Sequence, residues 1–440
     1  METQDPEPIF PQELRDAWPA LSRDERVESF KLVPHSTADD FFLSLSAQEQ
    51  ADLILALGPG ERRTWLRLLA PDDAVDVIQA TPPATRDALL SELDDTTRRE
   101  VHALLAYAED NAGGLMNPRF ARVRPEMTID EAISYLRRQT REKVETVYYA
   151  YVLDPQQHLL GVVSLRQLFQ SASDKRVEDV MSRDLVTVSE HTDQEAVSRL
   201  FASQSLMAIP VVDAERRMKG IVTVDDIVQV VQEEATEDIQ KVGGMEALDA
   251  PYFEVGILSM LKKRAGWLLV LFLGEMLTAT AMGYFEDEIA RAVVLALFVP
   301  LIISSGGNSG SQATTLIIRS LALNEVRLRD VWRVARREVI AGVALGATLG
   351  VVGIIRILVW QHFFGSYGEH FVLVALTVGL SLVGVVTWGT LSGSMLPFAL
   401  RRLGFDPASA SAPFVATLVD VSGLVIYFTV ASLLLRGTLL

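Results

Sequence analysis

Five long apolar stretches follow one another in the second part of the chain, and they constrain its fold more than any other feature. They cover residues 265–285, 292–318, 339–360, 371–400 and 413–435. Three charged residues occur within them, Glu275, Arg356 and Asp420. An α-helix needs about 20 apolar residues to cross the hydrocarbon core of a bilayer. A soluble core can hold one or two such stretches, so five in succession predict an α-helical membrane domain of five transmembrane helices over residues 265–440.

The basic residues around these stretches predict their orientation. They gather before the first span, between the second and third spans, and between the fourth and fifth spans: Lys262, Lys263, Arg264; Arg319, Arg327, Arg329, Arg333, Arg336, Arg337; Arg401, Arg402. Loops rich in Lys and Arg stay on the cytosolic side of a membrane. We therefore expect a multi-pass protein of the cell inner (plasma) membrane, in contact with membrane lipid, whose N-terminus is cytosolic and whose C-terminus lies outside.

Charge is distributed unevenly along the chain. Residues 1–264 contain 47 acidic and 29 basic side chains, whereas residues 265–440 contain 10 and 11. An acidic surface argues against nucleic acid as a partner, because phosphate binding needs a basic patch. It suits either a soluble domain kept dispersed by its charge or a domain that collects divalent cations. Cysteine is absent, which excludes disulfides and thiolate metal sites, and residues 1–10 lack the apolar run of a cleavable signal peptide.

Residues 1–115 predict an acidic, all-α N domain whose helices stack as a small superhelix. Short amphipathic segments alternate with breaks at prolines such as Pro34 and Pro59. Within residues 70–76, Asp72 and Asp76 are four residues apart and therefore share one face of a helix. The helix dipole explains an acid at the position of Asp72. Asp76 lies beyond the first turn, so metal binding is the alternative for this pair.

Residues 116–232 contain an internal repeat. Its two units, 116–172 and 180–232, share three matches: 116–123 with 181–188, 130–132 with 194–196, and 161–164 with 220–223. Each unit is expected to form a strand, a helix, two further strands and a second helix, with buried strands followed by turns. This α/β pair resembles a tandem of cystathionine-beta-synthase (CBS) domains.

The second unit has the CBS pattern of glycine, two apolar residues, threonine and a later aspartate, at Gly220, Thr223 and Asp226. The resemblance implies that Thr223 and Asp226 bind an adenine nucleotide, with the carboxylate accepting from the ribose, and it makes ATP a candidate regulatory ligand. The first unit has Gln167 at the corresponding position, so one nucleotide site is expected to be weaker or absent. An ordinary acid at a helix start is the other interpretation of Asp226.

Residues 233–264 connect the CBS pair to the membrane domain. A helix is expected to stop at Gly243 and Gly244. A second, amphipathic segment follows at about 252–264 and ends in three basic residues. It should lie on the membrane surface as a plug helix and link the cytosolic half mechanically to the pore.

The whole chain resembles the MgtE family of magnesium channels. The three most specific stretches are residues 234–244, 300–312 and 413–420. The resemblance implies a homodimer with a pore between two membrane domains, and Mg2+ as the conducted ion. It further implies that Asp420 holds this ion, with the carbonyl of Ala416 nearby.

The same resemblance implies regulatory Mg2+ sites between the N domain, the CBS pair and the plug helix. The matching acidic positions are Asp72, Asp76, Asp213, Asp225, Glu246, Asp249 and Glu254, with Asp406 on the membrane side. Glu246 replaces an aspartate of the family pattern. Ser311 occupies a variable position at which a pore-lining asparagine can occur.

The membrane segments support pore roles independently of the resemblance. An ionisable group in a span is costly, so Asp420 should face a cavity or a partner; a structural hydrogen bond to another helix is the alternative. Mg2+ sheds its water reluctantly and binds through few carboxylates. Asn308 and Gln312 offer amides for ion-bound water. Gly306 and Gly307 permit either helix unwinding beside the pore or close helix packing.

We therefore predict a Mg2+-selective channel for magnesium uptake that cytosolic Mg2+ closes by binding to the N domain, CBS pair and plug helix. A cation-coupled transporter of the sodium-exchange type is the main alternative, and a nucleotide-sensing membrane receptor is a second one. Glu275 has either a packing role or a pore role. An enzyme is not expected, because the sequence shows no nucleophile–base arrangement and no phosphate-binding loop.

Overall fold

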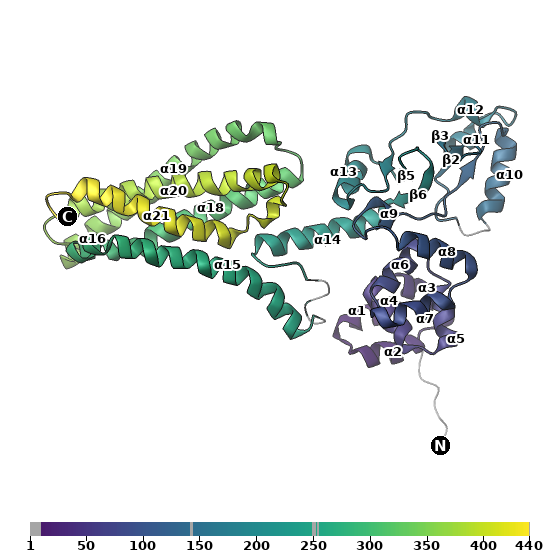
Figure 1. Ribbon diagram of the computed structural model, residues 1–440, viewed down its shortest axis with the longest axis horizontal. Helices are drawn as coiled ribbons and strands as arrows, with labels where there is room; N and C mark the ends of the chain where they lie inside the picture. The colour runs from purple at the N-terminus through teal and green to yellow at the C-terminus, as the bar shows by residue number, and fades with distance from the viewer. Residues whose placement is uncertain (1–9, 141–143, 249–251, 253–254, 440) are drawn as a thin grey trace, which may run out of the picture. The chain divides into compact units, whose positions relative to one another are not determined.

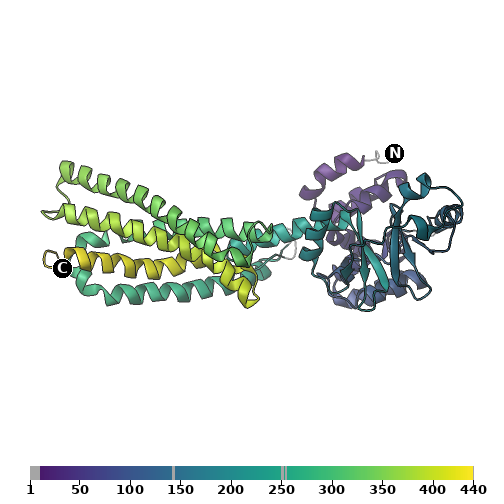
Figure 2. The same ribbon diagram turned by 90° about the horizontal axis from the view of Figure 1, so that it is seen from above.

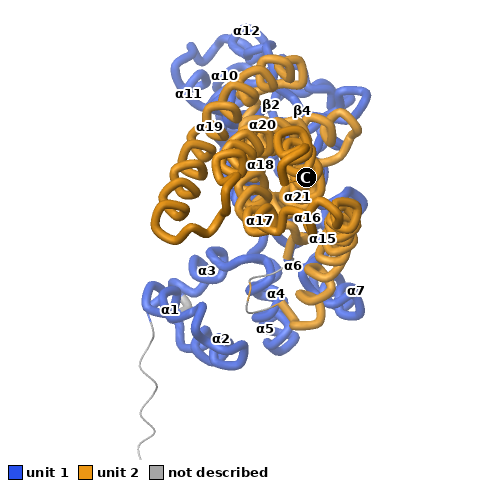
Figure 3. The backbone as a smooth tube through the Cα atoms, turned by 90° about the vertical axis from the view of Figure 1, so that its left-hand side faces the viewer, with its two compact units in different colours: residues 1–233 blue, residues 234–440 orange. Residues whose placement is uncertain are grey.

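The computed structural model describes residues 10–140, 144–248, 252 and 255–439. The chain forms two compact units, Met1–Glu233 and Glu234–Leu440 (Figure 3).

The first unit begins with short helices, as the proline pattern predicts. They are α1 (Pro11–Ala17), α2 (Arg23–Lys31), α3 (His35–Leu43), α4 (Ala47–Ala56), α5 (Pro59–Leu66), α6 (Pro71–Gln79), α7 (Pro83–Glu92), α8 (Asp95–Leu104) and α9 (Ala112–Leu115). Proline occupies the first turn of α5, α6 and α7, where its missing N–H costs nothing. The side chain of Asp94 accepts from two backbone N–H groups and caps α8. The expected all-α N domain is confirmed.

The repeat forms two three-stranded sheets of the same topology (Figure 1). The first CBS repeat contains β1 (Arg122–Val123), α10 (Ile129–Gln139), β2 (Tyr149–Leu153), β3 (Leu159–Ser164), α11 (Leu165–Gln170) and α12 (Val177–Val180). The second CBS repeat contains β4 (Val188–Ser189), α13 (Gln194–Gln204), β5 (Ala208–Val212), β6 (Met218–Thr223) and α14 (Val224–Val242). In each sheet the first pair of strands is parallel and the second antiparallel. The predicted tandem of α/β domains is confirmed.

The two glycines of the repeat make room for flanking segments. The backbone of Asn117, near the start of the first CBS repeat, exchanges two hydrogen bonds with Ile221 of β6, and Ser182 does the same with Val162 of β3. A Cβ atom on Gly220 would lie 2.7 Å from the carbonyl oxygen of Asn117. At Gly161 it would lie 2.6 Å from the sulfur of Met181. A side chain at either position would push the crossing segment away.

The second unit contains the membrane domain. Its helices are α15 (Ile257–Tyr284), α16 (Glu286–Arg291), α17 (Val293–Ala296), α18 (Val299–Ala322), α19 (Val331–Phe364), α20 (Phe371–Leu403) and α21 (Ala412–Leu435). Among the described residues, 5 helical segments are long and apolar enough to cross a membrane, as the sequence predicts. The helix α14 ends at Val242, and Gly244 follows with a φ of +76°. One unbroken helix, α15, contains both residues 257–264 and the first span.

Small residues set the packing of the membrane helices, which run alongside one another in both views (Figure 1, Figure 2). A Cβ atom on Gly389 of α20 would lie only 2.3 Å from the carbonyl oxygen of Gly306 in α18. The α19–α20 pair meets in the same way at Gly350 and Gly379. By contrast, 6% of the apolar window of α15 is buried, compared with 50% of that of α20. Within one chain, α15 therefore leaves most of its apolar surface uncovered.

Candidate ion sites

The first candidate site surrounds Asp420, in the first half of α21. Ser411 caps this helix by accepting from the N–H of Phe414 at 3.3 Å, and Pro413 follows in the first turn. Asp420 is half-buried. A Cβ atom on Gly307 of α18 would lie 3.5 Å from the Cα of Ala416 and 3.8 Å from Oδ1 of Asp420. The predicted residues Gly307, Ala416 and Asp420 therefore lie together.

A polar stripe extends along α18 beside Asp420. Its members follow helical spacing on one side of the helix and are exposed or half-buried in the single chain: Ser304, Asn308, Ser311, Gln312 and Thr315. The amide of Asn308 donates to Ser304 Oγ at 3.4 Å, and Ser311 Oγ donates to the carbonyl of Ala412 at 3.1 Å. Polar groups at membrane depth are stable where they face water or protein. This stripe is therefore suited to line an aqueous path or an interface between chains.

The other glycines of α18 pack inside the chain. A Cβ atom on Gly306 would lie 2.6 Å from Val385, and one on Gly310 would lie 2.9 Å from the carbonyl oxygen of Gly389. Both contacts are with α20, so close helix packing accounts for these two glycines. The pore-lining role of Gly306 stays a prediction.

The second candidate site is an acidic group inside the first unit. It joins three aspartates of α6, two at the start of α14 and one residue of the loop before β2: Asp72, Asp73, Asp76, Asp225, Asp226 and Glu145. Their charges repel one another. The fully buried amide of Asn117 donates to Asp72 Oδ1 at 3.0 Å and to Glu145 Oε2 at 2.8 Å. Tertiary packing thus places carboxylates from two distant segments, Asp72 and Glu145, on one amide.

Burial and repulsion raise the pKa values of Asp72, Asp76 and Asp226, which are buried or half-buried, whereas the side chains of Asp73, Asp225 and Glu145 are exposed. Burial, with repulsion from Asp226, raises the pKa of Asp72 well above its ordinary value. Burial raises the pKa of Asp76 to about 8 and that of Asp226 to about 7, and neighbouring carboxylates add to both shifts. Among the described residues, no three acidic or histidine side chains are close enough to hold a bare metal ion. The group suits a cation that keeps part of its water shell, as Mg2+ does.

The predicted nucleotide residues have a structural role at the start of α14. Both the N–H and the hydroxyl of Thr223 donate to Asp226 Oδ2, at 3.2 and 2.6 Å. In the first CBS repeat, the N–H and the hydroxyl of Ser164 donate to Gln167 Oε1 in the same way, at 2.8 and 2.9 Å. An acceptor is therefore needed here to cap the helix, and an amide serves as well as a carboxylate. Nucleotide binding by Thr223 and Asp226 stays a prediction.

The remaining predicted acids belong to a strand turn of the first unit or to the second unit, or lie outside the described residues. Asp213 belongs to the β5–β6 turn and pairs with Lys219 at 3.2 Å. Asp249 and Glu254 lie outside the described residues. In the second unit, the backbone N–H of Glu246 donates to the carbonyl of Lys263 at 3.3 Å.

Asp406 precedes the short 3-10 helix η4 (Pro407–Ser409) in the second unit. Its Oδ2 accepts from Lys241 Nζ at 2.7 Å, and Lys241 also pairs with Glu237. Burial acts to lower the pKa of Lys241, but these two carboxylates outweigh it and raise the pKa above its ordinary value. The end of α14 is thereby joined to the loop that leads into α21.

Sequence reasoning misses several of these residues. It does not single out Asp73, Glu145, Asn117 or Lys241, although each contacts a predicted site. Asp73 is adjacent to Asp72 and can be found from that position alone. The other three carry no local signal, because only the packing of distant segments gives them their neighbours.

Comparison with known proteins assigns the chain to a family. The MgtE model, described as a divalent cation transporter, matches residues 299–430. The MgtE intracellular N domain matches residues 9–110, and the CBS domain matches residues 112–174 and 177–233. The magnesium transporter MgtE of Thermus thermophilus is 42% identical over 98% of this chain and 94% of its own length. The chain belongs to the MgtE family.

Other MgtE proteins agree with this assignment. The magnesium transporter MgtE of Enterococcus faecalis is 33% identical over 77% of this chain and 72% of its own length. That of Bacillus subtilis is 30% identical over 91% and 87%. A crystal structure of the cytosolic domain of the Mg2+ channel MgtE in complex with ATP is 42% identical, covers 50% of this chain and 90% of that one, and has a TM-score of 0.47. As an MgtE family member, the protein is a multi-pass membrane transporter with an intracellular N-terminal domain.

Proposed function

We propose that the protein is a channel for Mg2+ uptake, formed by two copies of the membrane domain and closed by cytosolic Mg2+. The observation that carries the proposal is the position of Asp420 beside Gly307 and the polar stripe of α18. Relatives over most of the chain are named magnesium transporters, which supports Mg2+ as the ion.

The site around Asp420 suits a hydrated divalent cation. Two-fold symmetry would bring two copies of Asp420 to one axis, and their oxygens can hold the water shell of Mg2+. Gly307 presents no side chain, so it leaves room for this shell, and the carbonyl of Ala416 and the amide of Asn308 are suited to bind its water.

The acidic group of the first unit is the proposed sensor of cytosolic Mg2+. Burial of Asp72, Asp76 and Asp226 is costly, and so is the repulsion within the group; Mg2+ binding would offset both. A cation therefore stabilises the arrangement in which α6 lies against the start of α14. Mg2+ favours this arrangement only to the extent that it binds this arrangement more tightly than it binds the other arrangements of the unit. Glu246, Asp249, Glu254 and Asp406 are proposed to extend the response to the plug helix and the pore.

The decisive experiment is Mg2+ influx into proteoliposomes that contain a fluorescent indicator, under an inside-negative potential and without sodium. Asp420→Asn should abolish fast influx. Glu369→Gln removes an exposed carboxylate from the loop between α19 and α20 and is the matched control, with influx unchanged. Influx that requires sodium inside the vesicles would replace the channel with a sodium-coupled exchanger. Influx that survives Asp420→Asn would remove Asp420 from the ion path.

A further inference from the structure

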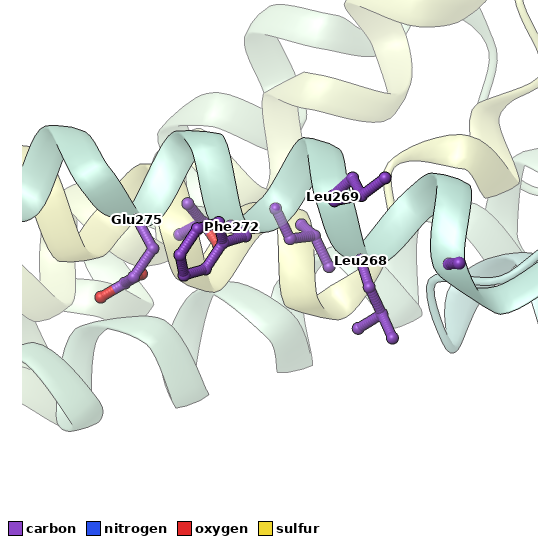
Figure 4. Close-up of a pocket in the computed structure, with 7 residues that line it drawn as sticks. Leu268, Leu269, Phe272 and Glu275 are labelled. Atoms are coloured by element: carbon purple, nitrogen blue, oxygen red, sulfur yellow. The ribbon is translucent and has the colours of Figure 1, made fainter.

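Glu275 is a charged residue in an apolar helix, and neither the packing nor the proposed channel accounts for it. It lies on α15 and is exposed in the single chain. It lines an open surface groove, and Figure 4 shows it on the same helix as Leu268, Leu269 and Phe272, which also line the groove. The groove is otherwise lined by Ala265, Leu271 and Thr417. Thr417 belongs to α21, so the groove lies where α15 meets the helix of Asp420.

A close contact between these helices brings Glu275 to Asp420. A Cβ atom on Gly274 would lie 2.7 Å from the methyl carbon of Thr417, so the absence of a side chain at Gly274 lets the two helices touch here. Glu275 directly follows Gly274, and Asp420 is one helical turn beyond Thr417. Glu275 is therefore close enough for its charge to act on the carboxyl group of Asp420.

A carboxylate at this depth is costly unless it faces water, a cation or a protein partner. The other residues that line the groove are apolar apart from Thr417, and none of them is a cation. The described part of the second unit places the second carboxylate, Asp420, beside it instead. Two adjacent carboxylates repel each other, and this repulsion is relieved when a cation lies between or beside them.

We propose that Glu275 is a second carboxylate of the ion path and determines its preference for divalent over monovalent cations. This inference rests on the proposed channel function. A divalent cation gains twice the electrostatic energy of a monovalent cation from each added carboxylate. One carboxylate per chain attracts both kinds of ion, whereas the pair Glu275 and Asp420 increases the difference between them.

The test compares Glu275→Gln with Met276→Gln in the full-length protein. The control, Met276→Gln, places the same glutamine side chain at the neighbouring, exposed position of α15. It therefore introduces an amide into this apolar helix while the charge of Glu275 is kept. Sodium flux into proteoliposomes is measured in divalent-free solution, and Mg2+ is then added until the flux is halved. Loss of one nearby charge should raise the half-blocking Mg2+ concentration about tenfold. Met276→Gln should leave it unchanged.

A second variant restores the charge chemically. Because the chain has no cysteine, Glu275→Cys has a single reactive thiol. A methanethiosulfonate reagent that adds a sulfonate should restore the half-blocking concentration towards that of the wild type, and a neutral ethyl reagent should not. The same response to both reagents, or an unchanged block in Glu275→Gln while the wild type conducts, would overturn the role of Glu275. A wild type without Mg2+ influx would instead overturn the proposed channel.

Discussion

Replacing Asp76 with asparagine is expected to stabilise the cytosolic unit in the absence of divalent cations. Burial is the largest cause that raises its pKa to about 8 from an ordinary 3.8, and Asp73 and Glu109 add repulsion. A pKa about four pH units higher in the folded state than in the unfolded chain lowers the free energy of unfolding by roughly 6 kcal/mol once the acid is ionised. Asp76 is partly exposed, so solvent screening reduces the expected gain from Asp76→Asn to about 2 kcal/mol.

The gain should depend on pH with a defined sign. Because its pKa is higher in the folded state, Asp76 keeps a proton that the unfolded chain loses as the pH rises from about 4 to about 8. Stability of the wild type therefore falls over this window and levels off above it. The asparagine of the variant has no proton to lose, so the difference between variant and wild type should be small near pH 4 and largest above about pH 8.

Mg2+ should reverse the order of stability. A ligand at free concentration c that binds only the folded state stabilises it by RT ln(1 + c/Kd), so the gain grows as the ligand binds more tightly. Asp76→Asn removes one of the carboxylates that attract Mg2+ and should weaken its binding. Urea unfolding of a fragment that ends at Val242, followed by circular dichroism with chelator and with saturating Mg2+, measures both effects. Asp40→Asn changes an exposed acid of α3 and is the control. A variant that is less stable than the wild type at high pH without Mg2+ would refute the reasoning.

Two further substitutions test the membrane unit. In Gly389→Ala the new methyl group would lie 2.3 Å from the carbonyl oxygen of Gly306, so α18 and α20 must separate; we expect a loss of about 2 kcal/mol, seen as earlier thermal aggregation in size-exclusion chromatography. Gly283→Ala, which meets nothing within 4 Å, is its control, and an equal loss in both variants would contradict the packing argument. Lys241→Met leaves the carboxylate of Asp406 without its ammonium partner; because this pair is partly exposed, we expect a loss of only about 1 kcal/mol, measured by the same assay.

Local patterns predict much of the fold. The five spans follow from apolar runs that identify a membrane helix without reference to the rest of the chain. The CBS pair is visible in the sequence because its two units repeat the same residues, and the structure places Tyr149 opposite Ser164 and Ala208 opposite Thr223 in matching registers. The helix end at Gly244 likewise follows from a local signal, and a positive φ is the physical reason for glycine there.

The composition of the candidate sites is less predictable. The family resemblance names Asp72, Asp76 and Asp225 as ion ligands, and this role stays a prediction. It assigns Asp226 to a nucleotide, yet the structure also gives this residue a capping bond to Thr223 and places it among the acids. The spacing of a motif identifies a helix start, but it does not say which distant residues approach that start.

The sequence by itself determined that the protein has an acidic helical domain, a CBS pair and five membrane spans, because apolar periodicity, repeats and charge act over a few residues. Only the tertiary structure decided that the amide of Asn117 joins Asp72 to Glu145 and that Glu275 lies near Asp420. Asn117 is 45 positions from Asp72 and 28 from Glu145 in the sequence. Glu275 and Asp420 are further apart still. Their electrostatic energy depends on distance in space and on burial, neither of which a local pattern contains.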